Sequence, residues 1–191
     1  MGFGFDESTP VVAGGGKKIN TMGINVVKIS KLEVVSNDLG TYLDVEVANK
    51  QGQTANQRYY EPIIGKAGVT EENIGWKTNA IIAQIKNIAS MYMPANYTVP
   101  PQPTFAAFLN KIVGDIGTKI NNVDVKTVIV YNNKDFPSLR QYGLIFESLN
   151  NTDPTKSLVL NDKDKLIRSQ GMSPEEIIST IKEDKNNDLP F

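Results

Sequence analysis

The stretch that decides the fold is residues 40–60, which read GTYLDVEVANKQGQTANQRYY. In its first half, apolar residues alternate with polar ones, a period of two that is typical of a strand with one face in the core. The inward-facing residues are Leu43, Val45 and Val47. The outward-facing residues are Tyr42, Asp44 and Glu46. A polar turn at 50–53 and a second strand-like run at 54–60 complete a predicted hairpin.

Upstream of this hairpin, residues 24–35 are rich in β-branched side chains. Their apolar residues fall at even positions and at odd positions, so one straight strand cannot bury all of them on one face. We expect a long strand whose inward face changes midway at a bend or bulge. Residues 24–60 therefore predict a three-stranded meander.

Helical periodicity follows in residues 61–122. Thr70 is a candidate N-cap for a helix that extends to about Met91, and residues 105–116 carry apolar side chains at spacings of three and four. Two further strands are predicted at 123–131 and 142–149, with the loop 132–137 between them. The fold class is α+β, mainly β, with a helical insertion at 61–122.

The composition excludes several classes of site. The chain has 191 residues, no Cys and no His, so disulfides, Cys or His zinc sites, thiol nucleophiles and imidazole-based triads are excluded. It carries 20 Lys and Arg against 21 Asp and Glu, a net charge of −1. Because there is no overall basic excess, any nucleic-acid footprint must be local. No cofactor or metal is implied.

The ends of the chain differ in composition from its centre. Residues 1–22 include Gly14-Gly15-Gly16-Lys17-Lys18 and predict a flexible arm, and residues 150–191 predict a polar, partly disordered tail. The body is then 23–149. No signal peptide or spanning segment is evident, so we expect a cytoplasmic protein without a membrane partner.

A meander, a helical insertion and two more strands match the order of a five-stranded OB barrel, in which the helix lies between the third and fourth strands. Residues 27–33, 40–47 and 52–60 resemble the first strands of phage-encoded single-stranded DNA-binding proteins. The ending Asp188-Leu189-Pro190-Phe191 resembles the carboxyl-terminal tip of the bacterial family of these proteins. The resemblance implies non-specific binding of single-stranded DNA in replication, recombination and repair, without catalysis.

In that family the tip docks partner enzymes. Here Phe191 offers a ring and the terminal carboxylate, Pro190 stiffens the peptide, and Asp188 adds attraction to a basic pocket, with Leu189 between them. Lys185 interrupts the acidic run that usually precedes such a tip. Whether the tail also competes with DNA for the body, and the oligomeric state, are left open.

Single-strand binding needs aromatic faces for bases and basic groups for phosphates. Arg58 and Tyr60 share a strand face, which makes Tyr60 the preferred stacking residue, while Tyr59 is expected in the core. Tyr42 lies on the polar face of its strand beside Asp44. The other candidate DNA contacts are Lys28, Lys31, Lys126, Tyr131, Lys134, Phe136 and Arg140.

Two other interpretations remain. The β-domain could belong to a structural or packaging-associated phage virion protein that binds other proteins. A metal-dependent nuclease is the third reading, with Asp44, Glu46 and Lys50 as its candidate cluster, although such alternation is also typical of an exposed strand.

Overall fold

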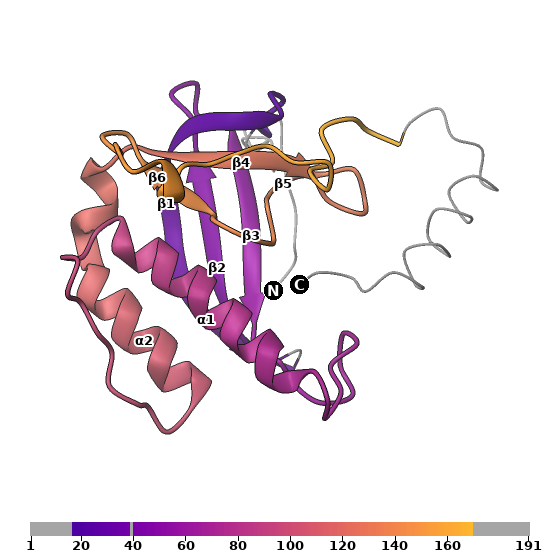
Figure 1. The fold of residues 1–191 in the computed structure, drawn as a ribbon, viewed down its shortest axis with the longest axis vertical. Coiled ribbons are helices and arrows are strands. Elements are labelled where there is room, and N and C mark those ends of the chain that lie inside the picture. Colours follow the sequence, from indigo (N-terminus) through magenta and orange to yellow (C-terminus); the bar gives the residue numbers. More distant parts are fainter. Residues whose placement is uncertain (1–16, 39, 170–191) are drawn as a thin grey trace, which may run out of the picture.

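The computed structural model describes residues 17–38 and 40–169. It contains a six-stranded antiparallel sheet and two α-helices (Figure 1). The elements are β1 (Gly23–Asn37), β2 (Gly40–Ala48), β3 (Thr54–Tyr60), α1 (Ile74–Ser90), α2 (Phe105–Ile116), β4 (Val125–Tyr131), β5 (Pro137–Leu139) and β6 (Phe146–Ser148), with short 3-10 turns at Gly117–Asn122 and Pro154–Lys156. The α+β class and the helical insertion between β3 and β4 are confirmed.

The strands follow the order β3-β2-β1-β4-β5, and β6 pairs with β4. The sheet curls so that its two edge strands, β3 and β5, lie next to each other. The Ser138 hydroxyl of β5 donates to the Asn56 carbonyl of β3 at 2.9 Å. No strand ladder joins β3 and β5 in the described part of the chain, so the sheet is strongly curved and not closed.

The expected irregularity in β1 is confirmed. The pairing of β1 with β2 shifts register between Ile29 and Lys31. Val27 and Ile29 are buried before the shift, and Leu32 and Val34 pack against the same core after it. The extra residue at Ser30 reverses the alternation and keeps both halves of this long strand facing inward.

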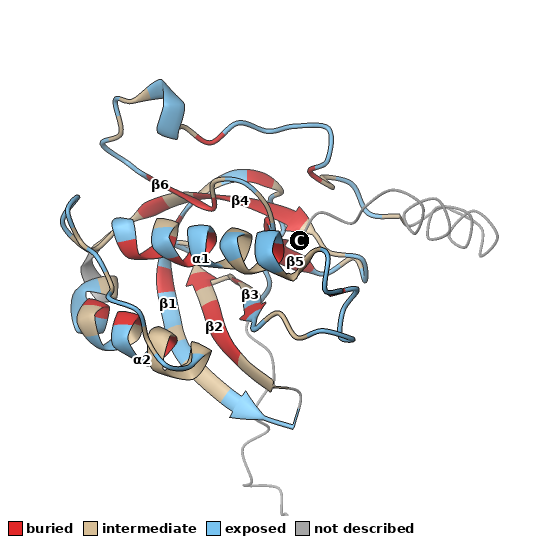
Figure 2. Ribbon diagram, turned by 60° about the horizontal axis from the view of Figure 1, so that its bottom comes forward, coloured by how far each residue is buried: buried red, intermediate tan, exposed pale blue. Residues whose placement is uncertain are grey.

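Helix α2 lies on the inner face of β1 and β2 and buries Leu109, Ile112 and Ile116. Its bounds agree with the predicted amphipathic stretch, and the Thr104 hydroxyl caps it by accepting the Ala107 amide at 3.1 Å. Figure 2 shows buried residues along much of β2 and β4.

Helix α1 begins at Ile74, four residues after the predicted cap Thr70. The Asn73 side chain explains the later start, because its oxygen accepts the Thr70 amide and its nitrogen donates to the Gly68 carbonyl. These local bonds hold residues 68–73 in a turn that competes with helix formation.

The predicted strand at 142–149 was wrong in extent. Only Phe146–Ser148 forms a strand, and β5 at Pro137–Leu139 lies partly within the predicted loop 132–137. Gly143 adopts a φ of +65°, and Asn87 of α1 accepts the amides of Ile145 and Phe146 through one oxygen. A helix side chain therefore takes the place of strand pairing there.

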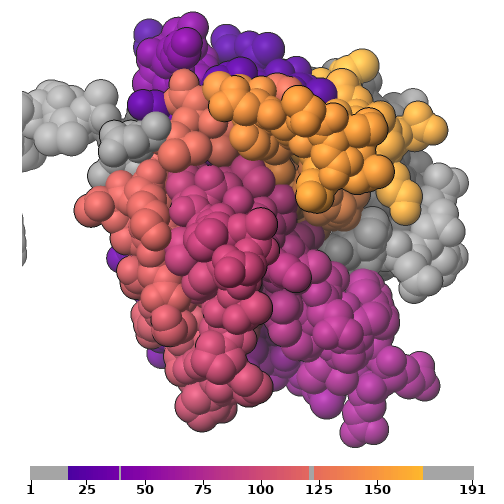
Figure 3. All heavy atoms as spheres, turned by 60° about the vertical axis from the view of Figure 1, so that its left-hand side comes forward, coloured from indigo at the N-terminus to yellow at the C-terminus, as the bar shows by residue number. Residues whose placement is uncertain are grey.

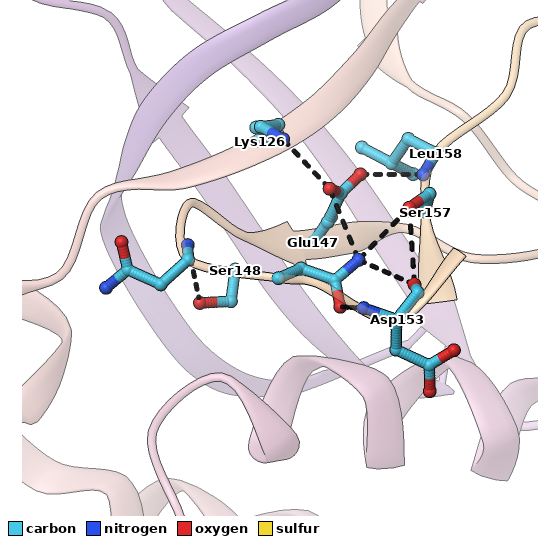
Figure 4. Close-up of polar contacts among 8 residues, drawn as sticks. Lys126, Glu147, Ser148, Asp153, Ser157 and Leu158 are labelled. Carbon is cyan, nitrogen blue, oxygen red and sulfur yellow. Dashed lines mark hydrogen bonds and ion pairs between the residues drawn. The ribbon is translucent and has the colours of Figure 1, made fainter. Parts of the chain in front are cut away.

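Residues 150–169, which the sequence assigns to the tail, pack on the outside of β4 and β6. The Glu147 carboxylate accepts hydrogen bonds from the Leu158 amide at 2.7 Å and from the Lys126 ammonium at 2.8 Å (Figure 4). The Asn151 side chain donates to Glu147 and to the Ser157 hydroxyl and so stabilises the turn between them. Leu158 covers Val128 and Val130.

Of the predicted arm 1–22, Ile19 is fully buried beside β3.

A space-filling view shows residues 61–120 covering one side of the molecule, with residues 146–165 packed above them (Figure 3). Within the described residues, no helix combines the length and the apolar character needed to cross a bilayer.

Candidate nucleic-acid interface

Three of the predicted contact residues meet on the outer face of β2 and β3. Tyr42 pairs with Tyr60 across the two strands, and their ring centroids are 4.7 Å apart. The guanidinium carbon of Arg58 lies 5.1 Å from the centre of the Tyr42 ring. We call Tyr42, Arg58 and Tyr60 the aromatic cluster.

Burial divides the tyrosines of this cluster into two roles. Tyr42 is only 5% exposed because Arg58 and Tyr60 flank it, whereas Tyr60 is 37% exposed. Tyr59 is 1% exposed and belongs to the core, so adjacent tyrosines of β3 lie on opposite faces as strand alternation requires. Tyr60 is the ring of this cluster that a base can reach.

The carboxylate beside the cluster is paired with basic groups. Asp44 lies 3.0 Å from the Lys31 ammonium and 3.5 Å from the Arg58 guanidinium. Hydrogen bonds to Glu33 and Asp44 raise the pKa of Lys31 above its usual range. A hydrogen bond with Tyr60 likewise raises the pKa of Arg58. Both basic groups stay charged, and the repulsion that Asp44 would exert on a phosphate is offset.

A cavity of about 670 Å³ opens beside the aromatic cluster, between β3, the loop 61–69 and α1. Arg58 and Tyr60 line it and so belong to both surfaces. Its apolar walls include Ile63, Val69 and Ile81, and its amides include Gln57, Gln84 and Gln141. Three basic residues, Arg58, Lys66 and Lys77, and one acidic residue, Glu61, complete the charged part of the wall.

The β4–β5 hairpin 131–137 carries more of the predicted residues. Asn132, which also lines the cavity, accepts the amides of Lys134 and Phe136 with its side chain and so shapes the turn. Phe136 is 60% exposed at the tip. The hairpin thus carries an exposed ring and an exposed ammonium, and its Asn132 lines the cavity.

Two basic residues that the sequence analysis missed join this hairpin. The Arg168 guanidinium lies over the Tyr131 ring at 5.2 Å, and Lys165 forms an ion pair with Asp135 at 2.9 Å. Both come from the segment 150–169, which sequence reasoning treated as tail. No local pattern marks them, because only the docking of that segment along β4 brings them to Tyr131.

Other predicted contacts lie away from this surface. Lys28 pairs with Ala48, six residues along β2 from Tyr42, which is about 20 Å in a strand. It contacts Asp124 at 3.8 Å. Lys126 is engaged by the buried Glu147 carboxylate at 2.8 Å. Neither adds to the charge around the cavity.

Arg140, predicted as a phosphate contact, is a structural residue. It is 4% exposed, and its guanidinium donates to the carbonyls of Val159 and Leu144 and to Asp164. These bonds hold the segment 157–166 on the body. With its charge already engaged in the interior, Arg140 is not available to a phosphate at the surface.

A second cavity, of about 710 Å³, lies at the opposite end of β2. Its lining is polar, with asparagine and glutamine side chains such as Asn25, Asn49 and Gln53, and includes no aromatic residue. It lacks the ring that stacking on a base requires. The cavity beside Tyr60 is therefore the better candidate.

The nuclease cluster considered from the sequence is taken up by other contacts. Asp44 is paired as described, and Glu46 accepts the Ser30 hydroxyl at 3.0 Å. Across residues 17–38 and 40–169, no group of three or more His, Cys, Asp or Glu side chains is arranged to hold a metal ion.

No protein-family model matches this chain, and no curated protein is significantly similar to it.

Proposed function

We propose that the protein binds single-stranded DNA with little sequence preference and that its fold is a variant of the OB barrel. The support for the fold is the strand order β3-β2-β1-β4-β5 with the helices between β3 and β4. In OB folds, the face of strands 2 and 3 and the loop between strands 4 and 5 bind oligonucleotides. The aromatic cluster and the hairpin 131–137 occupy these two places.

The observation that carries the proposal is the meeting of Tyr60, Arg58 and the hairpin around one cavity. An exposed tyrosine stacks on any base, because every base has a π-face, and basic side chains follow the phosphates. Arg58, Lys66, Lys134 and Arg168 supply this charge locally in a chain of net charge −1. No catalytic step is part of this proposal.

The tip Asp188-Leu189-Pro190-Phe191 lies outside the described residues. Its likeness to the family tip supports a second part of the proposal, that it docks proteins of replication, recombination and repair. A terminal Phe carboxylate suits an apolar pocket rimmed by basic residues.

The test is titration of the full chain against a labelled poly-thymidine oligonucleotide and its duplex counterpart at two salt concentrations, followed by anisotropy. Tight binding that favours the single strand and weakens with salt is expected, because phosphate neutralisation releases counterions. An absence of single-strand binding at low salt would reject the proposal and favour the virion-protein interpretation.

A further inference from the structure

The open edge of β3 faces the cavity over only two residues. The Glu61 amide donates to Thr41 of β2, so the odd-numbered residues of β3 direct their main-chain groups toward β2 and the even-numbered ones away from it. Of the even-numbered residues, Thr54 bonds to the segment 17–19 and the Asn56 carbonyl accepts from Ser138. The Arg58 carbonyl accepts the Gln57 side-chain amide at 2.9 Å. The Arg58 amide and the main-chain groups of Tyr60 remain, and both residues line the cavity.

Side-chain amides line the cavity next to this edge in a fixed arrangement. The side-chain oxygen of Gln57 accepts hydrogen bonds from the Ser138 hydroxyl at 2.9 Å and from the side-chain amide of Gln141 at 3.2 Å. The side-chain amide of Gln84 donates to the main-chain carbonyl of Gln141. Because this network orients the amides in advance, a ligand that meets their remaining donors and acceptors has little ordering cost.

Apolar side chains form another part of the wall, next to a loop that is held in place by Lys77. Ile81 of α1 and Val69 of the loop 61–69 contribute aliphatic surface. The Lys77 ammonium donates to the Gly68 carbonyl at 2.8 Å and holds the loop against the helix. A cavity of about 670 Å³ with apolar walls and a few oriented polar groups falls in the range of about 300–1,000 Å³ of small-ligand sites.

We propose that this cavity receives one nucleobase, unstacked from its neighbours, of a strand that crosses the aromatic cluster. This inference rests on the proposed function and deepens it. The base would lie between aliphatic walls, with its edge facing the main chain of β3 and the glutamine amides, groups of the kind that read base edges. Tyr60 at the mouth would stack on the adjacent base, and Arg58 and Lys66 would contact the flanking phosphates.

An extended peptide added to β3 is the competing occupant, and the geometry disfavours it. Strand addition uses a run of alternating main-chain groups along an edge. Here that edge is blocked at the Asn56 carbonyl by Ser138 and at the Arg58 carbonyl by Gln57, and it is open only at the Arg58 amide and at Tyr60. Two residues suit a planar ligand with two or three edge groups better than they suit a strand.

The test uses single-stranded oligonucleotides in which 2-aminopurine replaces one base at each position in turn. This analogue is quenched when stacked, so capture in the cavity should brighten it several-fold at one position of the bound strand. Ile81→Phe narrows the cavity and should abolish that brightening while total affinity falls less than tenfold. Ile82→Phe is the matched control, because Ile82 is 40% exposed on the same helix and does not line the cavity.

A second variant guards against a folding defect in Ile81→Phe. Gln141 is exposed, and its replacement by Ala removes only one amide group from the cavity wall. Gln141→Ala should therefore fold, and it should change which base is preferred at the brightened position. If the wild type binds the oligonucleotides but no position brightens, or if Ile81→Phe brightens like Ile82→Phe, the cavity inference is wrong and the proposed function stands. If no oligonucleotide binds, the proposed function fails first.

Discussion

Arg58 lies over the ring of Tyr42, with its guanidinium carbon 5.1 Å from the ring centre, while Tyr60 covers the same ring from the neighbouring strand. Tyr42 is consequently a buried support, and the two residues above it form the accessible surface. The geometry separates a base-stacking ring from the ring that positions it.

Replacing Tyr60 by Ala should weaken binding of a poly-thymidine oligonucleotide by about 1–3 kcal/mol, because one stacked base loses its platform. The double variant with Arg58→Ala should lose more, since a phosphate contact goes with it. Isothermal titration at fixed salt measures both. Unchanged affinity in the double variant would reject this surface as the DNA site.

The matched control is Lys28→Ala. Lys28 is also an exposed basic residue of the sheet, but it lies at the far end of β2 from Tyr42 and contacts Asp124. We expect the affinity of Lys28→Ala for the oligonucleotide to stay within about twofold of the wild-type affinity. A loss as large as that of Tyr60→Ala would move the DNA path to the other end of the sheet.

The hairpin makes a separate electrostatic prediction. Lys134 and Arg168 are both exposed, Lys134 in the turn of the hairpin and Arg168 over the Tyr131 ring. If each neutralises one phosphate, Lys134→Ala and Arg168→Ala should each reduce the slope of log K against log salt by roughly 0.7, the value for single strands. Titration at four or more salt concentrations gives the slope. A weaker affinity with an unaltered slope would instead indicate that these side chains only shape the hairpin.

Strand alternation was enough to predict β2, β3 and the bulge in β1, because each pattern is local and one face is buried. The same rule placed Tyr60 and Arg58 on one face. It failed for the predicted strand 142–149, where the Asn87 side chain accepts the main-chain amides of Ile145 and Phe146 from 58 and 59 residues away in sequence. Such a long-range contact produces no periodic pattern in the sequence of the residues whose amides it accepts.

The cavity was beyond prediction for a related reason. Its amides come from β3, α1 and the segment after β5, and nothing in the spacing of Gln57, Gln84 and Gln141 indicates that they meet. Arg140 shows the opposite error, since a basic residue after a predicted loop was assigned to the surface while the fold buries it against Asp164. In both cases the position depends on how distant segments pack.

The buried pair Arg140–Asp164 predicts a large effect on stability. The two side chains are 5% and 0% exposed and 3.3 Å apart. Arg140→Met should lower the free energy of unfolding by about 3–5 kcal/mol, because it leaves the Asp164 charge buried without its partner. Urea denaturation followed by circular dichroism measures the change.

The exposed pair Lys156–Asp153 is the control for Arg140, with side chains 75% and 41% exposed. Lys156→Ala should cost less than about 1 kcal/mol, as surface ion pairs do. Equal effects of the two substitutions would mean that the segment 157–166 is not held through Arg140.

Glu147 makes the stability depend on pH. The Leu158 amide, followed by Lys126, lowers the pKa of this carboxyl below its usual value of 4.5. Because the folded state prefers the carboxylate, this contribution is complete at neutral pH and is lost as the pH falls below about 4.5 toward the lowered pKa. Glu147→Gln should cost about 1.5–3 kcal/mol at pH 7, the range for hydrogen bonds to charged groups, and should flatten the decline in stability between pH 5 and pH 3. Thermal unfolding across this pH range compares the two proteins. If the decline were as steep in Glu147→Gln as in wild type, other carboxylates would account for it and the anchor at Leu158 would not depend on charge.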